Sequence, residues 1–295
     1  MSLFSLLGAL EIGLIFSLVA LGVFISFRLL RFPDLTVDGS FPLGGAVCAT
    51  LIASGTDPFS ATIIATFAGA AAGLVTGWLN VKLKIMDLLA SILMMIALYS
   101  VNLRIMGKPN VPLITEPTVF TILQPGWISD YVARPLILIV IVILAKLALD
   151  WFFATQTGLA VRATGSNGRM ARAQGVNTGR MILGGMALSN ALVALAGALF
   201  AQTQGGSDIS MGIGTIVIGL AAVIVGESIL PSRKLVLATL AVIIGAIVYR
   251  FFIALALNSD FIGLKAQDLN LVTAVLVTVA LVIPMLKRRL VGKKS

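Results

Sequence analysis

The chain has 295 residues, of which 59% are hydrophobic and 11% charged, and its mean hydropathy is +1.07. A soluble core needs no such apolar excess, so the composition indicates a polytopic membrane protein. The net charge of +9 does not indicate nucleic-acid binding, because the cations stand in short runs and form no continuous basic face. The sequence has no histidine for metal or proton-relay chemistry, and its single cysteine, Cys48, excludes an intrachain disulfide.

The first apolar stretch, 3–27, is expected to be a retained span, because it has neither a basic start nor a small-residue cleavage site. Residues 31–45 are rich in Pro, Gly and Asp, and the apolar run that follows, 46–54, is shorter than the about 20 residues of a regular span. We therefore predict a broken second span, whose irregular backbone is buried in protein or lines a cavity. In the alternative, Asp34 and Asp38 lie in a cytosolic loop and Asp38 caps a helix.

Seven further apolar stretches complete a prediction of about nine spans, at 59–80, 85–106, 135–153, 181–203, 211–230, 235–257 and 269–286. The stretch 181–203 is rich in small residues, including Gly184, Gly185 and Gly197, which permit close helix packing. Residues 107–134 contain four prolines and are expected to form a stiff outer loop that docks a soluble protein. In the alternative, this loop is a plain connector.

Residues 157–180 hold four arginines and no carboxylate. Each arginine would cost roughly 2.5–3.5 kcal/mol at the centre of a bilayer, so the stretch is expected in the cytosol. Within it we predict a short surface helix over 169–173, with Gly165 and Gly175 as stops on either side. In the alternative, the stretch is only a basic loop that fixes the topology.

The distribution of cations predicts the orientation in the membrane. With the C-terminal tail in the cytosol, sixteen of the 21 Lys and Arg residues fall on the inner side and five on the outer side or in outer halves of spans. The N-terminus is therefore expected outside and the C-terminus inside. The five outer cations are Arg104, Lys108, Arg134, Arg250 and Lys265.

Two segments of the sequence resemble each other, 34–55 and 207–227. Each begins with an Asp, continues with a Gly-rich opening and ends in a small-residue apolar run. We predict a single domain, 1–295, built from inverted repeats over 1–106 and 181–286, with the outer loop 107–134 and a cytosolic coupling loop 155–180 between them. The alternative is a chance likeness between Gly- and Ala-rich spans.

The segment GLAVRATGSNGRMARAQGVN resembles the coupling loop of permease subunits of ATP-binding-cassette importers, in the branched-chain amino acid and ribose permease family. The opening, SLVALGVFISFRLLRFPDLTVDGSFPLGGAV, is similar to that of the tryptophan/tyrosine importer permeases. One departure is Gly168, where proline is common, which loosens the start of the short helix. The residues expected to couple to an ATPase are Arg162, Gly165, Asn167, Arg169, Arg172 and Gly175.

The resemblance implies a homodimer of permeases, a cytosolic ATPase dimer and an external substrate-binding protein or lipoprotein, in the lipid of a bacterial cytoplasmic (inner) membrane. The sequence has no G-x-x-x-x-G-K-[ST] phosphate loop, so no catalytic residue, cofactor or metal is expected in this chain. ATP and magnesium would bind in the partner ATPase. The predicted function is passage of a small solute, an amino acid or a related compound, with aromatic ones among the candidates.

The alternative function is that of a self-sufficient ion-coupled secondary transporter or channel. Such a protein needs buried carboxylates or histidines along its path. The acids Glu11, Asp150 and Glu227 fall near the ends of predicted spans, and no predicted span has an acid at its middle. The sequence therefore favours an importer that draws its energy from a partner.

The translocation path is expected at the dimer axis, where flexible methionines and an aromatic ring form an adaptable apolar lining and amides bind polar groups of the solute. The alternative for each residue is ordinary packing between helices. The predicted path residues are Asp38, Ser40, Phe41, Met94, Met95, Asn102 and Asn190.

Overall fold

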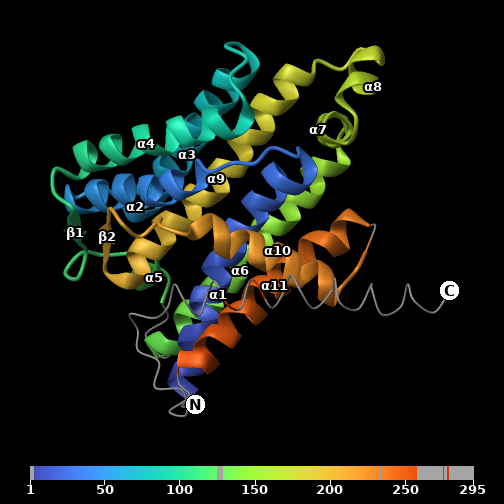
Figure 1. Cartoon of the computed structure of the whole chain (residues 1–295). Helices are drawn as coiled ribbons and strands as arrows, with labels where there is room; N and C mark the ends of the chain where they lie inside the picture. The colour runs from blue at the N-terminus through green and yellow to red at the C-terminus, as the bar shows by residue number, and fades with distance from the viewer. Residues whose placement is uncertain (1–2, 125–128, 233, 258–274, 276–277, 279–295) are drawn as a thin grey trace.

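The computed structural model describes residues 3–124, 129–232, 234–257, 275 and 278. Six of its helices are long and apolar enough to cross a membrane, so the described chain is an all-α polytopic membrane protein (Figure 1). The predicted outer cation Lys265 and most of the last predicted span, 269–286, lie outside the described residues. The six spans are Phe4–Leu29, Pro58–Val81, Asp87–Met106, Tyr131–Ala154, Thr178–Gln204 and Leu235–Ala256.

The first span is the centre of the bundle. Its α-helix, α1 (Leu3–Val23), continues directly into a π-helix, η1 (Phe24–Leu29). The span packs against α6 (Asp130–Ala154), α9 (Thr178–Gln204) and α11 (Leu235–Leu257), and 78% of its apolar window is buried. Protein rather than lipid therefore surrounds most of α1.

The second span begins with irregular backbone and continues as a short helix, α2 (Val37–Ala53). Phe32, Asp34 and Thr36 in the irregular segment are buried in protein, as a broken span requires. The helical part begins nine residues earlier than the apolar run that we had expected to form it. Pro42 lies inside α2, one turn past its start, and cannot donate the hydrogen bond that a residue there would make to the Asp38 carbonyl.

Small residues bring α2 into backbone contact with α9. A Cβ atom on Gly44 would lie 1.9 Å from the Ala194 carbonyl oxygen, and one on Gly197 would lie 1.9 Å from the Phe41 carbonyl oxygen. This confirms the predicted close packing at Gly197. Gly184, in the same helix, has no such neighbour, because no heavy atom of another described element lies within 4 Å of its Cβ position.

The predicted outer loop is partly folded onto the end of α9. After α3 (Pro58–Val81) and α4 (Asp87–Met106), strand β1 (Asn110–Pro112) pairs antiparallel with β2 (Gly206–Asp208), and α5 (Val119–Leu123) follows. Leu113 and Phe120 are buried, and the Val119 amide donates to Gln202 Oε1 at 2.9 Å. α6 begins at Asp130, five residues before the predicted span. The described part of the loop is therefore folded against the bundle, and its role in docking stays a prediction. Ile114, in this part, is exposed and 86% accessible.

The second short apolar helix, α10 (Thr215–Ile229), packs on α1 and α11, whereas α2 packs on α9 and α3. In addition, α1 packs on α11 and α9 packs on α3. These pairs are those that inverted repeats would produce if α1, α2 and α3 correspond to α9, α10 and α11. The repeats themselves stay a prediction.

One end of the bundle is strongly basic. There the helices α7 (Gln156–Ser166) and α8 (Gly168–Ala173) lie beside the start of α9, and the N-terminus lies at the opposite end (Figure 1). We call this the basic end, and its cations include Arg28, Arg31, Lys82, Arg162, Arg169, Arg172 and Arg180.

Candidate functional site

The coupling loop consists of two helices that share one capping residue. Asn167 ends α7 and begins α8, where its Oδ1 accepts a hydrogen bond from the Met170 amide at 3.1 Å. Gly175 has φ of +83° just after α8, as expected of a helix stop. The expectation of one helix between two glycine stops is wrong at Gly165, which lies inside α7.

Gly165 has a different role, that of a contact with the first span. A Cβ atom there would lie 1.8 Å from the Leu29 carbonyl oxygen, so only glycine lets α7 touch the end of η1. The α7–α8 pair is thereby seated directly on the central helix. α8 is therefore connected to η1 through α7, whose backbone packs directly on Leu29.

α8 presents cations and one apolar side chain to solvent. Arg169 and Arg172 are exposed and Met170 is 62% accessible, while Ala171 is buried. Arg162, on α7, is half-buried and lines a cavity beside η1. Of the predicted coupling residues, Arg169 and Arg172 are thus available to a partner, and Gly165, Asn167 and Gly175 shape the backbone.

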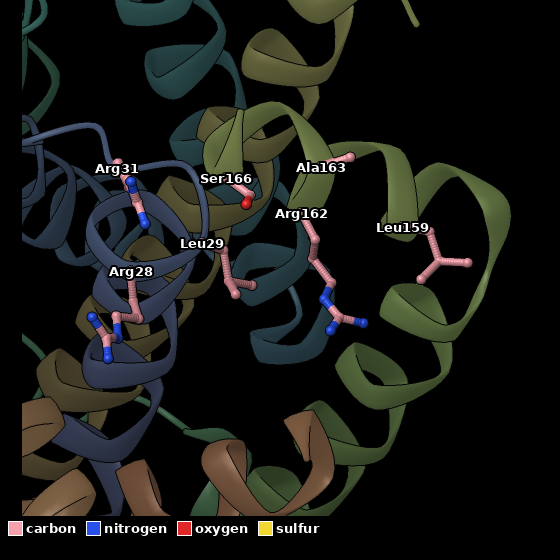
Figure 2. Close-up of a pocket in the computed structure, with 7 residues that line it drawn as sticks. All are labelled: Arg28, Leu29, Arg31, Leu159, Arg162, Ala163 and Ser166. Carbon is pink, nitrogen blue, oxygen red and sulfur yellow. The ribbon is translucent and has the colours of Figure 1, made fainter. Parts of the chain in front are cut away.

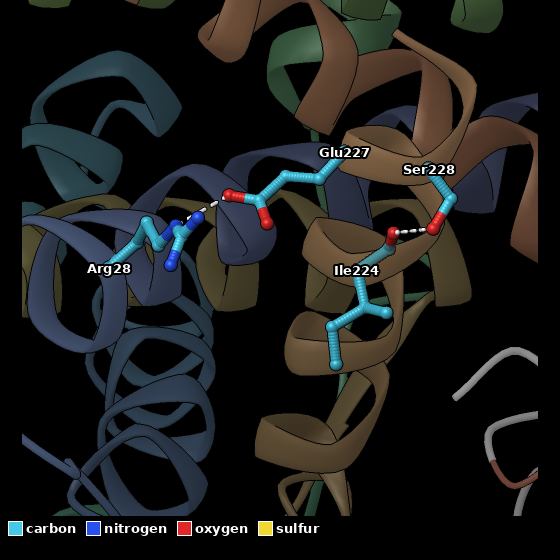
Figure 3. A network of polar contacts seen from close by, with 4 residues as sticks. All are labelled: Arg28, Ile224, Glu227 and Ser228. Carbon is cyan, nitrogen blue, oxygen red and sulfur yellow. Dashed lines mark hydrogen bonds and ion pairs between the residues drawn. The ribbon is translucent and has the colours of Figure 1, made fainter. Parts of the chain in front are cut away.

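An ion pair links η1 to the C-terminal end of α10 at the basic end. Arg28 Nε lies 2.7 Å from Glu227 Oε1, and Ser228 Oγ donates to the Ile224 carbonyl in the same helix (Figure 3). Both charged side chains are partly exposed, so the pair contributes at most about 1 kcal/mol. Its position still connects the second short helix to the first span.

A buried hydrogen-bond network holds the irregular part of the second span against the middle of α9. Asn190 Nδ2 donates to Asp34 Oδ2 at 2.8 Å, and Ser40 Oγ donates to Asn190 Oδ1 at 2.7 Å. The Thr36 amide donates to the other carboxylate oxygen of Asp34 at 3.0 Å, and Thr36 shares a hydroxyl contact with Thr76. All five residues are at most 1% exposed, so Ser40 and Asn190 bind protein groups here.

Asp38 caps a helix other than its own. Its Oδ1 accepts from the Ile216 amide at 2.7 Å and its Oδ2 from the Gly214 amide at 3.3 Å, at the N-terminal end of α10. The alternative prediction that Asp38 caps a helix is therefore correct in its capping chemistry. The helix that it caps, however, has its N-cap residue, Gly214, 176 positions away along the chain. The N-termini of α2 and α10 meet at this carboxylate.

The acids Glu11, Asp150 and Glu227 are predicted near span ends. Asp34, in the predicted broken span, is instead buried inside the bundle. It contacts Asn190, which stands near the middle of α9. The sequence predicted that this segment is buried or lines a cavity, but a hydropathy pattern does not show which distant helix its polar side chains contact.

A cavity of about 460 Å³ lies beside Asp38, between α2, α4 and the segment before α10. Within it, Asn102 Nδ2 donates to the Gly39 carbonyl at 3.2 Å. Asn102 Oδ1 is buried and accepts no hydrogen bond within the part of the chain that the structure describes. The lining residues are Asp38, Gly39, Pro42, Met95, Ile96, Tyr99, Ser100, Asn102, Ile209 and Ile213.

Three predicted path residues, Asp38, Met95 and Asn102, line this cavity. The others lie elsewhere: Ser40 and Asn190 belong to the buried network, Met94 packs with Leu43, Ala72 and Leu98, and Phe41 stacks on Phe16 with ring centroids 5.8 Å apart. Tyr99 also lines the cavity and was not among the predicted path residues. Its signal was the helical spacing of Met95, Tyr99 and Asn102, which places all three on one face of α4.

Cysteine labelling tests which of these residues faces water. In a Cys48→Ser background, we expect Met95→Cys to react with a membrane-impermeant maleimide, because Met95 lines the cavity. Phe41→Cys is the matched control and should stay unlabelled, because Phe41 is fully buried. Equal labelling of both variants, or none of Met95→Cys in any nucleotide state of the transporter, would contradict this assignment.

Apolar spans, a basic helix pair at one end and a cavity between a broken span and α4 together define the class of polytopic membrane permeases. The family model described as the permease component of branched-chain amino acid transport systems matches residues 5–286, and the chain belongs to this family. It is a permease component of an ATP-binding-cassette transport system.

Several known proteins are similar to the chain. A tyrosine transport system permease protein of Clostridioides difficile is 40% identical over 265 residues, which cover 90% of this chain and 86% of the relative. An uncharacterized protein of Rickettsia prowazekii is 34% identical over 94% of this chain and 96% of its own length. The ribose import permease of Escherichia coli is 27% identical over 85% of this chain and 76% of its own length. No solved structure gives a significant match.

Proposed function

We propose that the chain forms the translocation path for an amino acid, with an aromatic one as the first candidate, in an ATP-driven importer of a bacterial cytoplasmic membrane. The observation that carries the proposal is the cavity at Asp38, where Met95 and Tyr99 offer an apolar, polarizable wall. At its inner side lies the buried Asn102, whose Oδ1 accepts no hydrogen bond within the described residues. Similarity to a tyrosine transport permease over most of both chains supports an amino acid as solute.

The cytosolic partner would be an ATPase dimer, which binds ATP and magnesium and docks on α8. The cations at the basic end support a cytosolic position for α8, since positive charge favours the inner side. Arg169 and Arg172 provide charge and Met170 an apolar anchor for a groove in the ATPase. The contact of Gly165 with Leu29 would pass movement of that groove on to the first span.

A second copy of the chain would pack against α4, forming a homodimer around the path. Only 22% of the apolar window of α4 is buried, and Ile96 and Tyr99 on its cavity side are 60% and 57% accessible. An apolar helix with a solute cavity on its exposed face is better placed at a dimer axis than against lipid, because lipid chains would fill the cavity. The inverted repeats would let the two short helices, α2 and α10, move against each other at Asp38.

The outer partner would be a substrate-binding protein or lipoprotein docked near the β1–β2 ribbon. Ile114 offers an apolar tip there, and Asp208 a charge. Hydrogen bonds from the hydroxyl and amide of Ser210 hold the pKa of Asp208 below its usual range, so this carboxylate is ionised at neutral pH.

Reconstitution tests the proposal directly. The chain, purified with a co-expressed ATPase and placed in proteoliposomes with its binding protein, is expected to accumulate labelled tyrosine only when ATP is supplied on the side of the ATPase. A Tyr99→Ala variant should transport more slowly while the complex stays assembled. Accumulation driven by a proton or sodium gradient, without any ATPase, would overturn the proposal in favour of an ion-coupled transporter.

A further inference from the structure

A second cavity, of about 430 Å³, lies at the basic end between the end of η1 and helix α7 (Figure 2). None of its lining side chains is acidic, and three are arginines that come from two separate elements. The lining residues are Arg28, Leu29, Arg31, Leu159, Arg162, Ala163 and Ser166. The two elements are held together where Gly165 contacts Leu29.

The positive charge around this cavity is only partly neutralised. Arg28 uses its Nε for Glu227, and its two terminal amino groups have no ion pair within the described residues. Arg31 and Arg162 form no ion pair with any carboxylate in the described part of the chain. Guanidinium groups bind phosphate oxygens in paired, directional hydrogen bonds, so a cavity with this lining suits a phosphate group.

The backbone of Arg31 is held in an unusual conformation that places it at the cavity. Its φ is +56°, a left-handed value that residues other than glycine rarely adopt. The hydrogen bond from the Phe32 amide to the Ser26 carbonyl, at 2.8 Å, closes this turn at the end of η1. Glycine would satisfy the turn at lower cost, and a strained residue at a helix end points to a functional side chain.

The surroundings of the cavity correspond to the headgroup level of a bilayer. It lies just past Leu29, where the first span ends, and near the start of α7, which follows the span ending at Ala154. Trp151, in the last turn of that span, is 74% accessible, as is typical of an interfacial aromatic residue. Leu159 is 51% accessible and stands one helical turn before Arg162, so the rim offers apolar surface beside the arginines.

We propose that this cavity binds the phosphate headgroup of an anionic phospholipid, with Arg31 and Arg162 as its principal ligands and Leu159 against the glycerol and acyl region. Basic pockets between helices at a membrane surface are suited to such headgroups. The bound lipid bridges η1 and α7, and so stiffens the joint that seats the α7–α8 pair on the first span. The inference stands on this cavity alone and does not depend on which solute the permease carries.

Lipid binding to the full chain, purified in detergent, can be measured by native mass spectrometry. We expect dioleoylphosphatidylglycerol to bind more tightly than dioleoylphosphatidylcholine, which has the same acyl chains and no net charge. Arg31→Gln and Arg162→Gln should each lower the affinity for phosphatidylglycerol about fivefold, the contribution of one arginine near an anionic surface. Lys82→Gln is the matched control, an exposed cation of the basic end outside the cavity, and should leave the affinity unchanged.

Arg31→Gly separates binding from folding. Glycine accepts the left-handed backbone, so this variant should unfold at the same temperature as the unmodified chain or higher, and yet lose affinity for phosphatidylglycerol. Retained affinity in the Arg31→Gly and Arg162→Gln variants, or equal binding of the two lipids, would overturn the proposal. Competition by millimolar inorganic phosphate that abolishes the lipid preference would overturn the lipid source and leave a free-anion site.

Discussion

Replacing Arg172 with glutamate is expected to abolish substrate-stimulated ATP hydrolysis by the assembled transporter, while the chain stays inserted in the membrane and folded. Arg172 is exposed in the last turn of α8, so its replacement should leave the packing of the bundle unchanged. The reversal replaces attraction by repulsion at a docking groove and places a negative charge at the negative end of a helix. The measurement is phosphate release by the complex in nanodiscs, with and without loaded binding protein.

Lys82→Glu is the control for this experiment. Lys82 is an exposed cation just after α3, at the same end of the bundle. Its replacement by glutamate changes the net charge by the same amount as Arg172→Glu and leaves α8 unaltered. Stimulated hydrolysis should survive in this variant. If Arg172→Glu hydrolyses ATP at the normal stimulated rate in an intact complex, α8 does not carry the coupling.

Replacing Gly197 with alanine is expected to destabilise the permease by about 1–3 kcal/mol, the usual cost of overpacking a tight contact. The added methyl group would lie 1.9 Å from the Phe41 carbonyl oxygen, which is backbone and has no rotamer to change. α9 and α2 must therefore move apart. That movement would also disturb the ring of Phe41, which packs on Phe16 and Phe200 at centroid distances of 5.8 and 5.5 Å.

Gly184→Ala tests the same substitution in the same helix without the contact. Because no heavy atom of another described element lies within 4 Å of its Cβ position, this change should be neutral or should stabilise α9 by up to about 1 kcal/mol through helix propensity. Thermal unfolding in detergent, followed with size-exclusion profiles, compares the two variants. Equal melting temperatures would show that the contact of α2 with α9 yields easily and does not set the stability of the bundle.

The hydropathy pattern by itself determined that the chain is a polytopic membrane protein, and it located the long spans to within a few residues. This works because a lipid-facing helix must be apolar along its whole length, whatever it packs against. The broken second span was visible for a related reason, since Pro, Gly and Asp between 31 and 45 cannot face lipid. The arginines of 157–180 likewise marked a surface segment without any knowledge of its neighbours.

Local signals in that segment were less informative about shape. Asn167 and Gly175 act at helix ends through their own backbone, and Gly175 was recognised as a stop from the sequence. Gly165 was also predicted to end a helix, but it lies inside α7 and permits the contact with Leu29. The sequence alone does not distinguish a glycine that ends a helix from one that permits a close contact.

Only the tertiary structure decided what the polar residues of the second span do. Asp38 caps α10 and Asp34 bonds to Asn190, partners more than 150 residues away along the chain, and no periodicity encodes such a distance. The same holds for the cavity that joins Met95 and Asn102 to Asp38, and for the cavity that joins Arg31 to Arg162. Hydropathy and turn propensities depend on residues that are close in the sequence. These sites, in contrast, form where the ends of helices bring segments together that are far apart along the chain.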